Sequence, residues 1–417
     1  MTTQSATGEW LAERSVGHSL KSTMFEYFED NYTWNMAVNL ALGMGASIGD
    51  IDDASRALRP LAKRRDDAAA EKFFEAWTAL GAKLKRLAAA DEARGRRLSA
   101  GEKYRRAFIS FIQAERMQRP DFAPRQQAYR EALDCFSRFL TLTRRNCRRL
   151  DVPYLNTSLP ALLVGAHNDG ADAPCMIHFD GLDVTKEIIY LLGIPDALAA
   201  RGIATLVVDN PGVGESLRFR GLHNSPEAEA PAKAAVDFLQ SAPGIDRNRI
   251  GIMALSLGGY HAPRAAAFEP RLKCCVAWGA NYDWGETQRR RYQAKEQRLP
   301  VPHYWEHVAW VFGKSSVEDV IAVSEKLSLK GILHQIKCPI LCIHGENDRQ
   351  IPLSQAQQLI ADCTSSPRAE LHVQTLADGG AEHCGVDNVA PTREAICDWV
   401  AEVLGGNPAG MSPALQG

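Results

Sequence analysis

The stretch Arg249-Ile-Gly-Ile-Met-Ala-Leu-Ser256-Leu-Gly-Gly-Tyr260 decides the fold of this chain. Its apolar run ends at Ser256, and two glycines and the helix-compatible run 261–268 follow at once. This order predicts a nucleophile elbow, a sharp strand-to-helix turn that presents a serine hydroxyl and needs small neighbouring residues. Ala254 and Gly258 supply them, although Ala254 replaces the first glycine of the pattern G-x-S-x-G. An ordinary Ser-Leu-Gly-Gly turn has the same local sequence, so the rest of the chain must decide.

After Pro153, short apolar and β-branched runs alternate with helical segments such as 186–200 and 229–240. The apolar runs cover residues 161–164, 175–179, 203–208, 250–255, 272–278, 340–343 and 370–373. Continuous apolar strands separated by helices are typical of a mostly parallel sheet that is covered on both faces. We therefore predict a doubly wound α/β domain over residues 151–404. Its ligands should bind beyond the carboxyl ends of the strands.

A serine elbow on this fold predicts an α/β-hydrolase, in which an acid follows the serine in the chain and a histidine comes last. The acid candidate is Asp348, because its loop directly follows the apolar strand Leu341-Cys-Ile-His-Gly. A carboxylate in that loop would be held rigidly by the sheet. Glu346 is the competing acid in the same loop, and Asp348 matches the usual position better.

The base candidate is His383, in a Gly-rich loop between the last expected strand and the terminal helix. The glycines of this loop leave the imidazole free to reach the serine. A lone histidine there would be an ordinary surface residue, but after a serine elbow and an acid in the correct order it is predicted to be catalytic. His344 and His372 fall inside expected strands, and we interpret them as core or edge residues.

A hydrolase must also stabilise the oxyanion of its tetrahedral intermediate. The segment 176–187 follows an early strand, where the second oxyanion donor normally lies, so the amides of Leu182 and Leu257 form the predicted pair. The loop Asp209-Asn-Pro-Gly-Val-Gly-Glu-Ser216 lacks both the G-x-G-x-x-G spacing and the lysine of a P-loop. We interpret it as a strand-to-loop turn rather than a phosphate site.

The first 150 residues have helical periodicity and predict an N-terminal helical cap or lid domain. Two helices are expected over residues 67–118, with a capping box of Ser99 and Glu102 at the start of the second, and a third over 124–143. The aromatic stretch 24–34 has two interpretations. It forms helical core, or it is a lid whose Tyr32 and Trp34 line a substrate pocket.

Composition narrows the class of protein further. A net charge of −2 over 417 residues does not favour binding to nucleic acid or membranes. No apolar run is long enough for a signal peptide or a membrane span, and the ten cysteines contain no C-x-x-C pair, so we predict a cytoplasmic protein. No metal-ligand spacing is evident, and we expect no cofactor. The tail 405–417 is rich in Gly and Pro and is predicted to be disordered.

Four motifs together resemble the FrsA-like family of α/β-hydrolases, which includes dihydroxypseudooxynicotine hydrolase and fungal hydrolases that shorten polyketide chains in pigment synthesis. The motifs are Gly181-Leu-Asp-Val-Thr-Lys-Glu187, Asp209-Asn-Pro-Gly-Val-Gly-Glu-Ser216, the segment 256–270 that begins Ser256-Leu-Gly-Gly-Tyr-His-Ala-Pro, and Trp278-Gly-Ala-Asn-Tyr-Asp-Trp284. The helical segments 77–117 and 130–142 extend the resemblance over most of the chain.

The resemblance implies the same three triad residues, with Ser256 as nucleophile, Asp348 as acid and His383 as base. It also implies that the N-terminal helices cap the active site and that the protein is a homodimer. A polar residue after the strand that ends at Trp278 is expected to orient the substrate, and Asp283 and Glu286 are the candidates.

The implied activity is hydrolysis of a small molecule, in which a C–C bond next to a carbonyl is cleaved in an aromatic or polyketide-like ketone of the β-diketone type. The triad by itself does not distinguish this reaction from that of a carboxylesterase or lactonase. A third alternative is a non-catalytic regulatory binding protein on a hydrolase scaffold. The complete set of Ser256, Asp348 and His383 argues against that alternative, because a scaffold without activity would be expected to have lost at least one of them.

Overall fold

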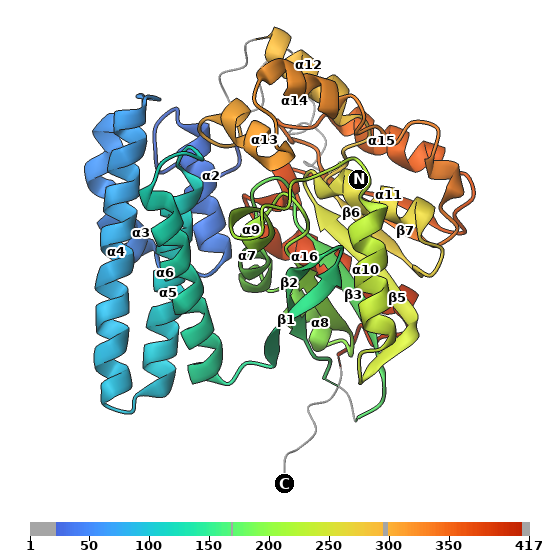
Figure 1. Cartoon of the computed structure of the whole chain (residues 1–417), viewed down its shortest axis with the longest axis horizontal. Coiled ribbons are helices and arrows are strands. Elements are labelled where there is room, and N and C mark those ends of the chain that lie inside the picture. Colours follow the sequence, from blue (N-terminus) through green and yellow to red (C-terminus); the bar gives the residue numbers. More distant parts are fainter. Residues whose placement is uncertain (1–21, 168–169, 295–298, 411–417) are drawn as a thin grey trace, which may run out of the picture.

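The computed structural model describes residues 22–167, 170–294 and 299–410, and Figure 1 shows a group of helices standing beside an α/β unit. The last seven residues of the predicted disordered tail, 411–417, lie outside the described residues. Residues 405–410 are held against the α/β unit, because the Asn407 amide donates to the Arg201 carbonyl at 3.0 Å. Among the described residues, no helix combines the length and the apolarity that crossing a membrane requires.

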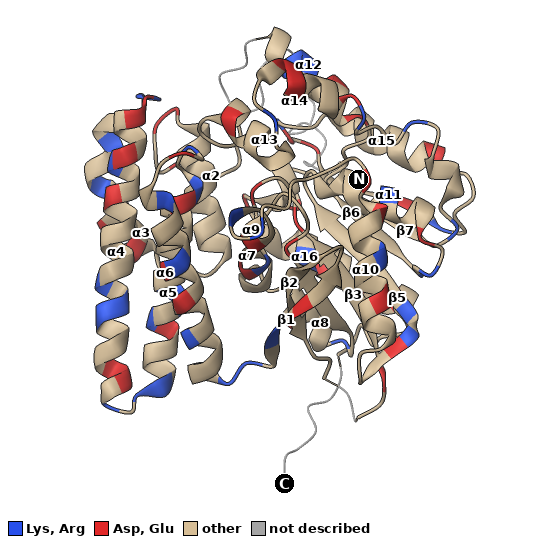
Figure 2. Ribbon diagram, viewed as in Figure 1, with Lys and Arg blue, Asp and Glu red and all other residues tan. Residues whose placement is uncertain are grey.

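The helical part contains three long helices side by side (Figure 1). Their bounds, with those of the shorter helices before them, are α2 (Tyr32–Gly43), α3 (Ile48–Ser55), η1 (Arg56–Leu61), α4 (Asp67–Ala93), α5 (Arg97–Arg116) and α6 (Pro124–Thr143). The inner faces pack through aromatic rings such as Phe73 and Trp77, which stack at 5.4 Å between centroids. Figure 2 shows basic and acidic residues intermixed along α4, α5 and α6, in agreement with the small net charge.

The predicted capping box at Ser99 is wrong. Helix α5 begins at Arg97, so Ser99 lies inside its first turn, and the helix has no side-chain cap. The reason is the tight connection from α4, in which Gly95 adopts a φ of +70° and the Arg96 amide donates to the Asp91 carbonyl. This turn starts the second helix earlier than the sequence pattern suggests.

The predicted doubly wound, mostly parallel sheet is confirmed. In the described part of the chain, its eight strands lie in the order β1-β2-β4-β3-β5-β6-β7-β8, and there only the pairs β1/β2 and β2/β4 are antiparallel. The strands are β1 (Cys147–Tyr154), β2 (Thr157–Val164), β3 (Ala173–Phe179), β4 (Ala204–Val208), β5 (Ile245–Leu255), β6 (Cys275–Trp278), β7 (Ile340–Gly345) and β8 (Ala369–Gln374). Strand β1 was not predicted, because an exposed edge strand with Arg148, Arg149 and Asp151 carries no apolar run.

Helices cover both faces of the sheet (Figure 1). They are α7 (Lys186–Leu191), α8 (Ile194–Ala199), α9 (Gly214–Arg218), α10 (Glu229–Gln240), α11 (Gly258–Phe268), α12 (Trp284–Gln293), α13 (Tyr304–Phe312), α14 (Val317–Ser324), α15 (Leu353–Asp362) and α16 (Val389–Leu404). The helix expected over 186–200 is two helices, because Gly193 adopts a φ of +82° between them. Alternate residues of β5 face the two cores, with Met253 on one side and Ala254 on the other.

The strands that carry the predicted catalytic loops end in register. Leu255 of β5 pairs with Trp278 of β6, which pairs with Ile343 of β7. Because parallel strands share one carboxyl edge, the loops after β5, β6 and β7 emerge side by side. This edge is where the site is built.

Candidate active site

Ser256 lies in the turn between β5 and α11, where the sequence predicts it. Its φ of +60° is a left-handed conformation that is uncommon for a residue with a side chain. The Ser256 amide donates to the Trp278 carbonyl at 2.8 Å, and the Asn281 side-chain amide donates to the Ser256 carbonyl at 2.7 Å. These bonds hold the turn in its strained form, so that the hydroxyl points to the loops after the strands.

The small residues of the elbow are required by close packing. A Cβ on Gly259 would lie 1.7 Å from the Gly279 carbonyl oxygen, and a Cβ on Gly258 would lie 2.4 Å from that of Ala254. Ala254 fills the place of the missing first glycine because its methyl group fits beside Gly258. The departure from G-x-S-x-G therefore leaves the turn intact.

The structure brings Ser256, His383 and Asp348 together in one hydrogen-bonded chain. His383 Nε2 lies 2.8 Å from Ser256 Oγ, and His383 Nδ1 lies 2.7 Å from Asp348 Oδ2. An ionised carboxylate only accepts hydrogen bonds, so Nδ1 carries the proton and Nε2 is free to accept the serine proton. This is the arrangement in which a histidine can activate a serine hydroxyl.

The Asp348 carboxylate is buried and held in its ionised form. Burial by itself raises the pKa of Asp348, but His383 outweighs this effect, and His344 and the Ile351 amide add to it, so that the pKa lies below its ordinary value. The second oxygen, Oδ1, accepts from the amides of Gln350 and Ile351 at 2.8 and 3.0 Å. The acid therefore has a fixed position and a negative charge at neutral pH.

His383 is buried beside this charge. Burial opposes the imidazolium form, but the Asp348 carboxylate favours it more strongly, and the pKa of His383 lies well above its ordinary value. The pair therefore stabilises the imidazolium that forms when the serine loses its proton.

The competing acid, Glu346, does not reach the histidine. Its carboxylate accepts from the Leu376 amide on the neighbouring loop. His344 lies in β7, as predicted, but it also links two loops: its Nδ1 accepts from the Ala280 amide at 3.1 Å and its Nε2 donates to the Ile351 carbonyl at 3.1 Å. Sequence reasoning missed this role, since nothing local distinguishes such a histidine from a core residue.

The two residues predicted to supply oxyanion donors, Leu182 and Leu257, lie on the same cavity wall as Ser256. A Cβ on Gly181 would lie 2.8 Å from the Leu255 carbonyl and 3.0 Å from Ser256 Cβ, so only glycine lets this loop approach the serine. Among the described residues, the amides of Leu182 and Leu257 donate to no protein acceptor. Both are available to a developing negative charge in the cavity.

The cavity above Ser256 and His383 has a volume of about 1060 Å³, including its open side. Most of its walls are apolar, and both parts of the chain contribute to them. The helical part supplies Met36, Leu40 and Met117, and the α/β unit supplies Trp278, Trp284 and Ile351. Such a cavity suits a mainly apolar small molecule with a few polar groups.

Tyr32 and Trp34 lie on a smaller adjoining pocket and not on this cavity. Trp34 packs between Phe28 and Phe73, with ring centroids at 5.0 and 5.1 Å, so its indole belongs to the helical core. Tyr32 accepts a hydrogen bond from the Gln350 side chain at 3.2 Å. The residues of α2 that do line the cavity are Thr33, Met36, Ala37, Asn39, Leu40 and Gly43.

Asp283 and Glu286 are also outside the cavity walls. Asp283 caps α12, where its carboxylate accepts from the Glu286 amide at 2.8 Å, and the Glu286 side chain is exposed. Between β6 and the end of α12, the polar residues that line the cavity are Asn281, Thr287 and Arg291. Thr287 directly follows Glu286 in α12, and which of the two side chains faces the cavity depends on the rotation of the helix about its axis, which the sequence does not show.

Residues 193–407, a little more than half of the chain, match the model of the prolyl oligopeptidase family. The chain belongs to the prolyl oligopeptidase family. It is therefore a hydrolase of α/β-hydrolase fold, and the matched residues include all three members of the Ser256, Asp348 and His383 chain.

The chain is also similar to the 2,6-dihydropseudooxynicotine hydrolase of Paenarthrobacter nicotinovorans, at 25% identity over 83% of this chain and 88% of the relative. It is also similar to the 20-hydroxy-prefusarin hydrolase FUS2 of Gibberella moniliformis, at 29% identity over 81% of this chain and 89% of the relative. The crystal structure of the 2,6-dihydroxy-pseudo-oxynicotine hydrolase superimposes with a TM-score of 0.71 at 25% identity, covering 91% and 99% of the two chains. The resemblance drawn from the four sequence motifs is thereby confirmed.

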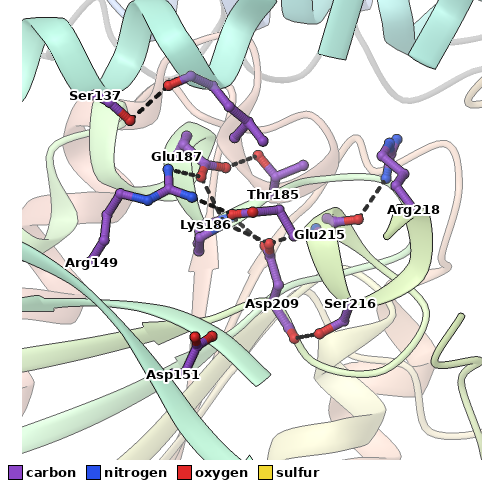
Figure 3. A network of polar contacts seen from close by, with 12 residues as sticks. Ser137, Arg149, Asp151, Thr185, Lys186, Glu187, Asp209, Glu215, Ser216 and Arg218 are labelled. Atoms are coloured by element: carbon purple, nitrogen blue, oxygen red, sulfur yellow. Dashed lines mark hydrogen bonds and ion pairs between the residues drawn. The ribbon is translucent and has the colours of Figure 1, made fainter. Parts of the chain in front are cut away.

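In this family member, two of those motifs meet in a buried charged network (Figure 3). The Lys186 ammonium lies 2.7 Å from carboxylate oxygens of Glu187, Asp209 and Glu215. Asp209 also accepts from the Lys186 amide at 2.9 Å and from the Glu215 amide at 2.8 Å. Burial alone would raise the pKa of Asp209, but Lys186 lowers it below its ordinary value. The network ties the loop after β3 to the loop after β4.

The described residues hold no group of three or more His, Cys, Asp or Glu side chains arranged to bind a metal ion. Beside the hydrogen-bonded chain lies one thiol, since Cys384 Sγ is 3.7 Å from His383 Nε2. What the site can do is activate a hydroxyl as a nucleophile beside two available amide donors.

Proposed function

We propose that the chain is a serine hydrolase that uses Ser256, His383 and Asp348 as a catalytic triad and works through an acyl-enzyme. The observation that carries this proposal is the hydrogen-bonded chain with distances of 2.8 and 2.7 Å, at the floor of an apolar cavity. In the reaction, His383 removes the Ser256 proton while the serine oxygen attacks a substrate carbonyl.

The remaining steps follow from the positions of the same groups. The amides of Leu182 and Leu257 donate to the oxyanion of the tetrahedral intermediate. The imidazolium of His383 then protonates the leaving group, and water attacks the acyl-enzyme with His383 again as base. The Asp348 carboxylate keeps the imidazole in the required tautomer throughout.

For the substrate, we propose an aromatic or polyketide-like ketone that is cleaved at the C–C bond next to its carbonyl. The leaving carbanion is then stabilised as an enol, and an apolar cavity protects it until His383 protonates it. The similarity to hydrolases named for 2,6-dihydropseudooxynicotine and 20-hydroxy-prefusarin supports a small organic substrate.

A carboxylesterase or lactonase is the second candidate, since the same triad attacks an ester carbonyl. The apolar walls and the similarity to hydrolases of small organic molecules suit either substrate. The bond that breaks depends on the substrate carbonyl and its leaving group. Product analysis must therefore decide between them.

The test is product analysis by mass spectrometry with phenolic β-diketones, aryl esters and a lactone, using wild type and Ser256→Ala. We expect wild type, and not Ser256→Ala, to release a carboxylic acid and a shortened ketone from a β-diketone. If only esters or lactones are turned over, and this turnover needs Ser256, the protein is a carboxylesterase or lactonase instead. Equal turnover by wild type and Ser256→Ala would refute the proposal that Ser256 is the nucleophile of a catalytic triad.

We also propose that the N-terminal helices form the cap of this site and that the chain is a homodimer. Residues of α2 and α5 line the cavity, which supports the role as a cap. The homodimer comes from the family resemblance, and light scattering at a range of concentrations tests it.

A further inference from the structure

The oxyanion loop, residues 180–187, carries a charge next to its proposed catalytic amide. Asp183 directly follows Leu182 in the chain and lines the same cavity as Ser256. A carboxylate beside the place where negative charge develops raises the energy of the transition state, because like charges repel more strongly in a site with little water. The loop therefore needs a partner for Asp183.

Arg116, in the last turn of α5, provides that partner from the helical part of the chain. Its guanidinium forms a close ion pair with the Asp183 carboxylate, and its Nε donates to the Asp183 carbonyl at 3.4 Å. The Arg116 side chain is 5% exposed and that of Asp183 is 16% exposed. A third contact, from Arg116 to the Gln113 side chain at 3.3 Å, fixes the guanidinium against its own helix.

The other contacts of the oxyanion loop fix its two ends and do not involve the Asp183 carboxylate, which pairs with Arg116. The Asp180 amide donates to the Asn210 side chain at 2.8 Å, and Lys186 is held by Asp209 (Figure 3). His307 Nε2 lies 3.4 Å from the carbonyl oxygen of Leu182. Burial lowers the pKa of His307 to about 4, so this imidazole is neutral and adds no positive charge.

We infer that Arg116 is a positioning residue for the oxyanion donor: it holds the backbone at Asp183 and neutralises that carboxylate, so that the Leu182 amide meets the oxyanion without a competing negative charge. The inference rests on the proposed function, since it assumes an oxyanion at Ser256. It gives the helical part a role in the chemical step as well as in covering the site.

The test compares Arg116→Met, Asp183→Asn and the double variant, with Arg106→Met as the matched control. Arg106 lies on the same helix and pairs with Asp50 at 2.8 Å, away from the cavity. We expect kcat/KM of Arg116→Met to fall by roughly 10- to 100-fold, less than the 10²–10³ of a lost oxyanion donor. The double variant should recover the part of this loss that comes from the unpaired charge, because it has no charge left to neutralise, while the part that comes from the lost contact with the Asp183 carbonyl remains.

A second measurement separates this role from a purely structural one. The inhibition constants of a boronic acid, which mimics the tetrahedral oxyanion, should rise in Arg116→Met by the same factor as kcat/KM falls. The inhibition constant of the neutral ketone product should stay nearly constant. Far-ultraviolet circular dichroism and thermal unfolding check the fold, and Arg116→Gln, which also removes the charge but keeps a hydrogen-bond donor, replaces Arg116→Met if that variant does not fold.

Two results would overturn the inference while leaving the triad in place: Arg116→Met as active as Arg106→Met, or a double variant as impaired as Arg116→Met alone. The second result would mean that the Asp183 charge is not what Arg116 offsets. Failure of the proposed function looks different, because wild type and Ser256→Ala would then have equal turnover.

Discussion

Replacing Asp348 by asparagine tests the proposed triad at the residue that controls its charge. Asparagine keeps the size of the side chain and removes the negative charge 2.7 Å from His383 Nδ1. Two unit charges about 4 Å apart interact by about 4 kcal/mol at an effective dielectric constant of about 20. If this energy is lost from the transition state, where His383 is an imidazolium, kcat/KM falls by about 10³-fold.

The pH dependence gives the same variant a second readout. In wild type, Asp348 holds the pKa of His383 well above its ordinary value, so the rise of kcat/KM with pH should occur above about pH 6.5. In Asp348→Asn the strongest effect that raises this pKa is removed, and burial, which lowers the pKa of a histidine, is then opposed only by the neighbouring Cys384 thiol. The rise in activity should therefore move to lower pH, while the plateau is far below that of wild type.

The assay measures kcat/KM from about pH 5 to about pH 10 with the substrate identified by product analysis. Glu346→Gln is the matched control, because it makes the same chemical change in the same loop on a carboxylate that contacts the Leu376 amide instead of His383. We expect Glu346→Gln to keep the wild-type profile. An Asp348→Asn variant with the wild-type pH profile, or a Glu346→Gln variant with the larger loss, would refute the assignment of the acid.

Two further predictions concern the elbow and the aromatic stretch before α2. Gly259→Ala should abolish soluble expression, because its Cβ would lie 1.7 Å from the Gly279 carbonyl oxygen, a worse clash than the overpacking that costs about 1–3 kcal/mol. The control Gly49→Ala, in an open helical position, should express normally. Trp34→Ala should lower the free energy of unfolding in urea by about 3–5 kcal/mol and change KM less than Met36→Ala does, because Trp34 packs in the helical core while Met36 lines the cavity. A Trp34→Ala variant of wild-type stability with a raised KM would restore the lid interpretation.

The sequence predicts those residues of the candidate site that directly follow a recognisable strand and that occur along the chain in the order typical of the fold. Ser256 follows an apolar strand and precedes two glycines, and Asp348 and His383 follow later strands in the order that the fold requires. The structure brings all three within hydrogen-bonding distance. Each of these residues could be found because the end of a strand can be recognised in the sequence, and the strand end determines where the side chain that follows it lies.

Residues whose role depends on which way an element faces could not be found in this way. Trp34 and Met36 are both apolar and two positions apart in α2, yet one packs in the core and the other lines the cavity. Asp283 looked like a substrate ligand and is a helix cap, since the same short carboxylate suits both tasks. The pairing of Arg116 with Asp183 joins positions 67 residues apart, and no local pattern indicates it.

The helical part is not a separate lid, because it packs against the sheet and contributes residues to the wall of the active site. One continuous apolar cluster runs from Phe73 in α4 through Met253 in β5 to Trp399 in α16, so the helices share a core with the sheet. A lid that opens would have to expose that core, which costs about 25 cal/mol per Å² of apolar surface. Substrate entry is therefore better explained by the open side of the cavity than by movement of the helices, and Arg116 can hold Asp183 in a constant position through the catalytic cycle.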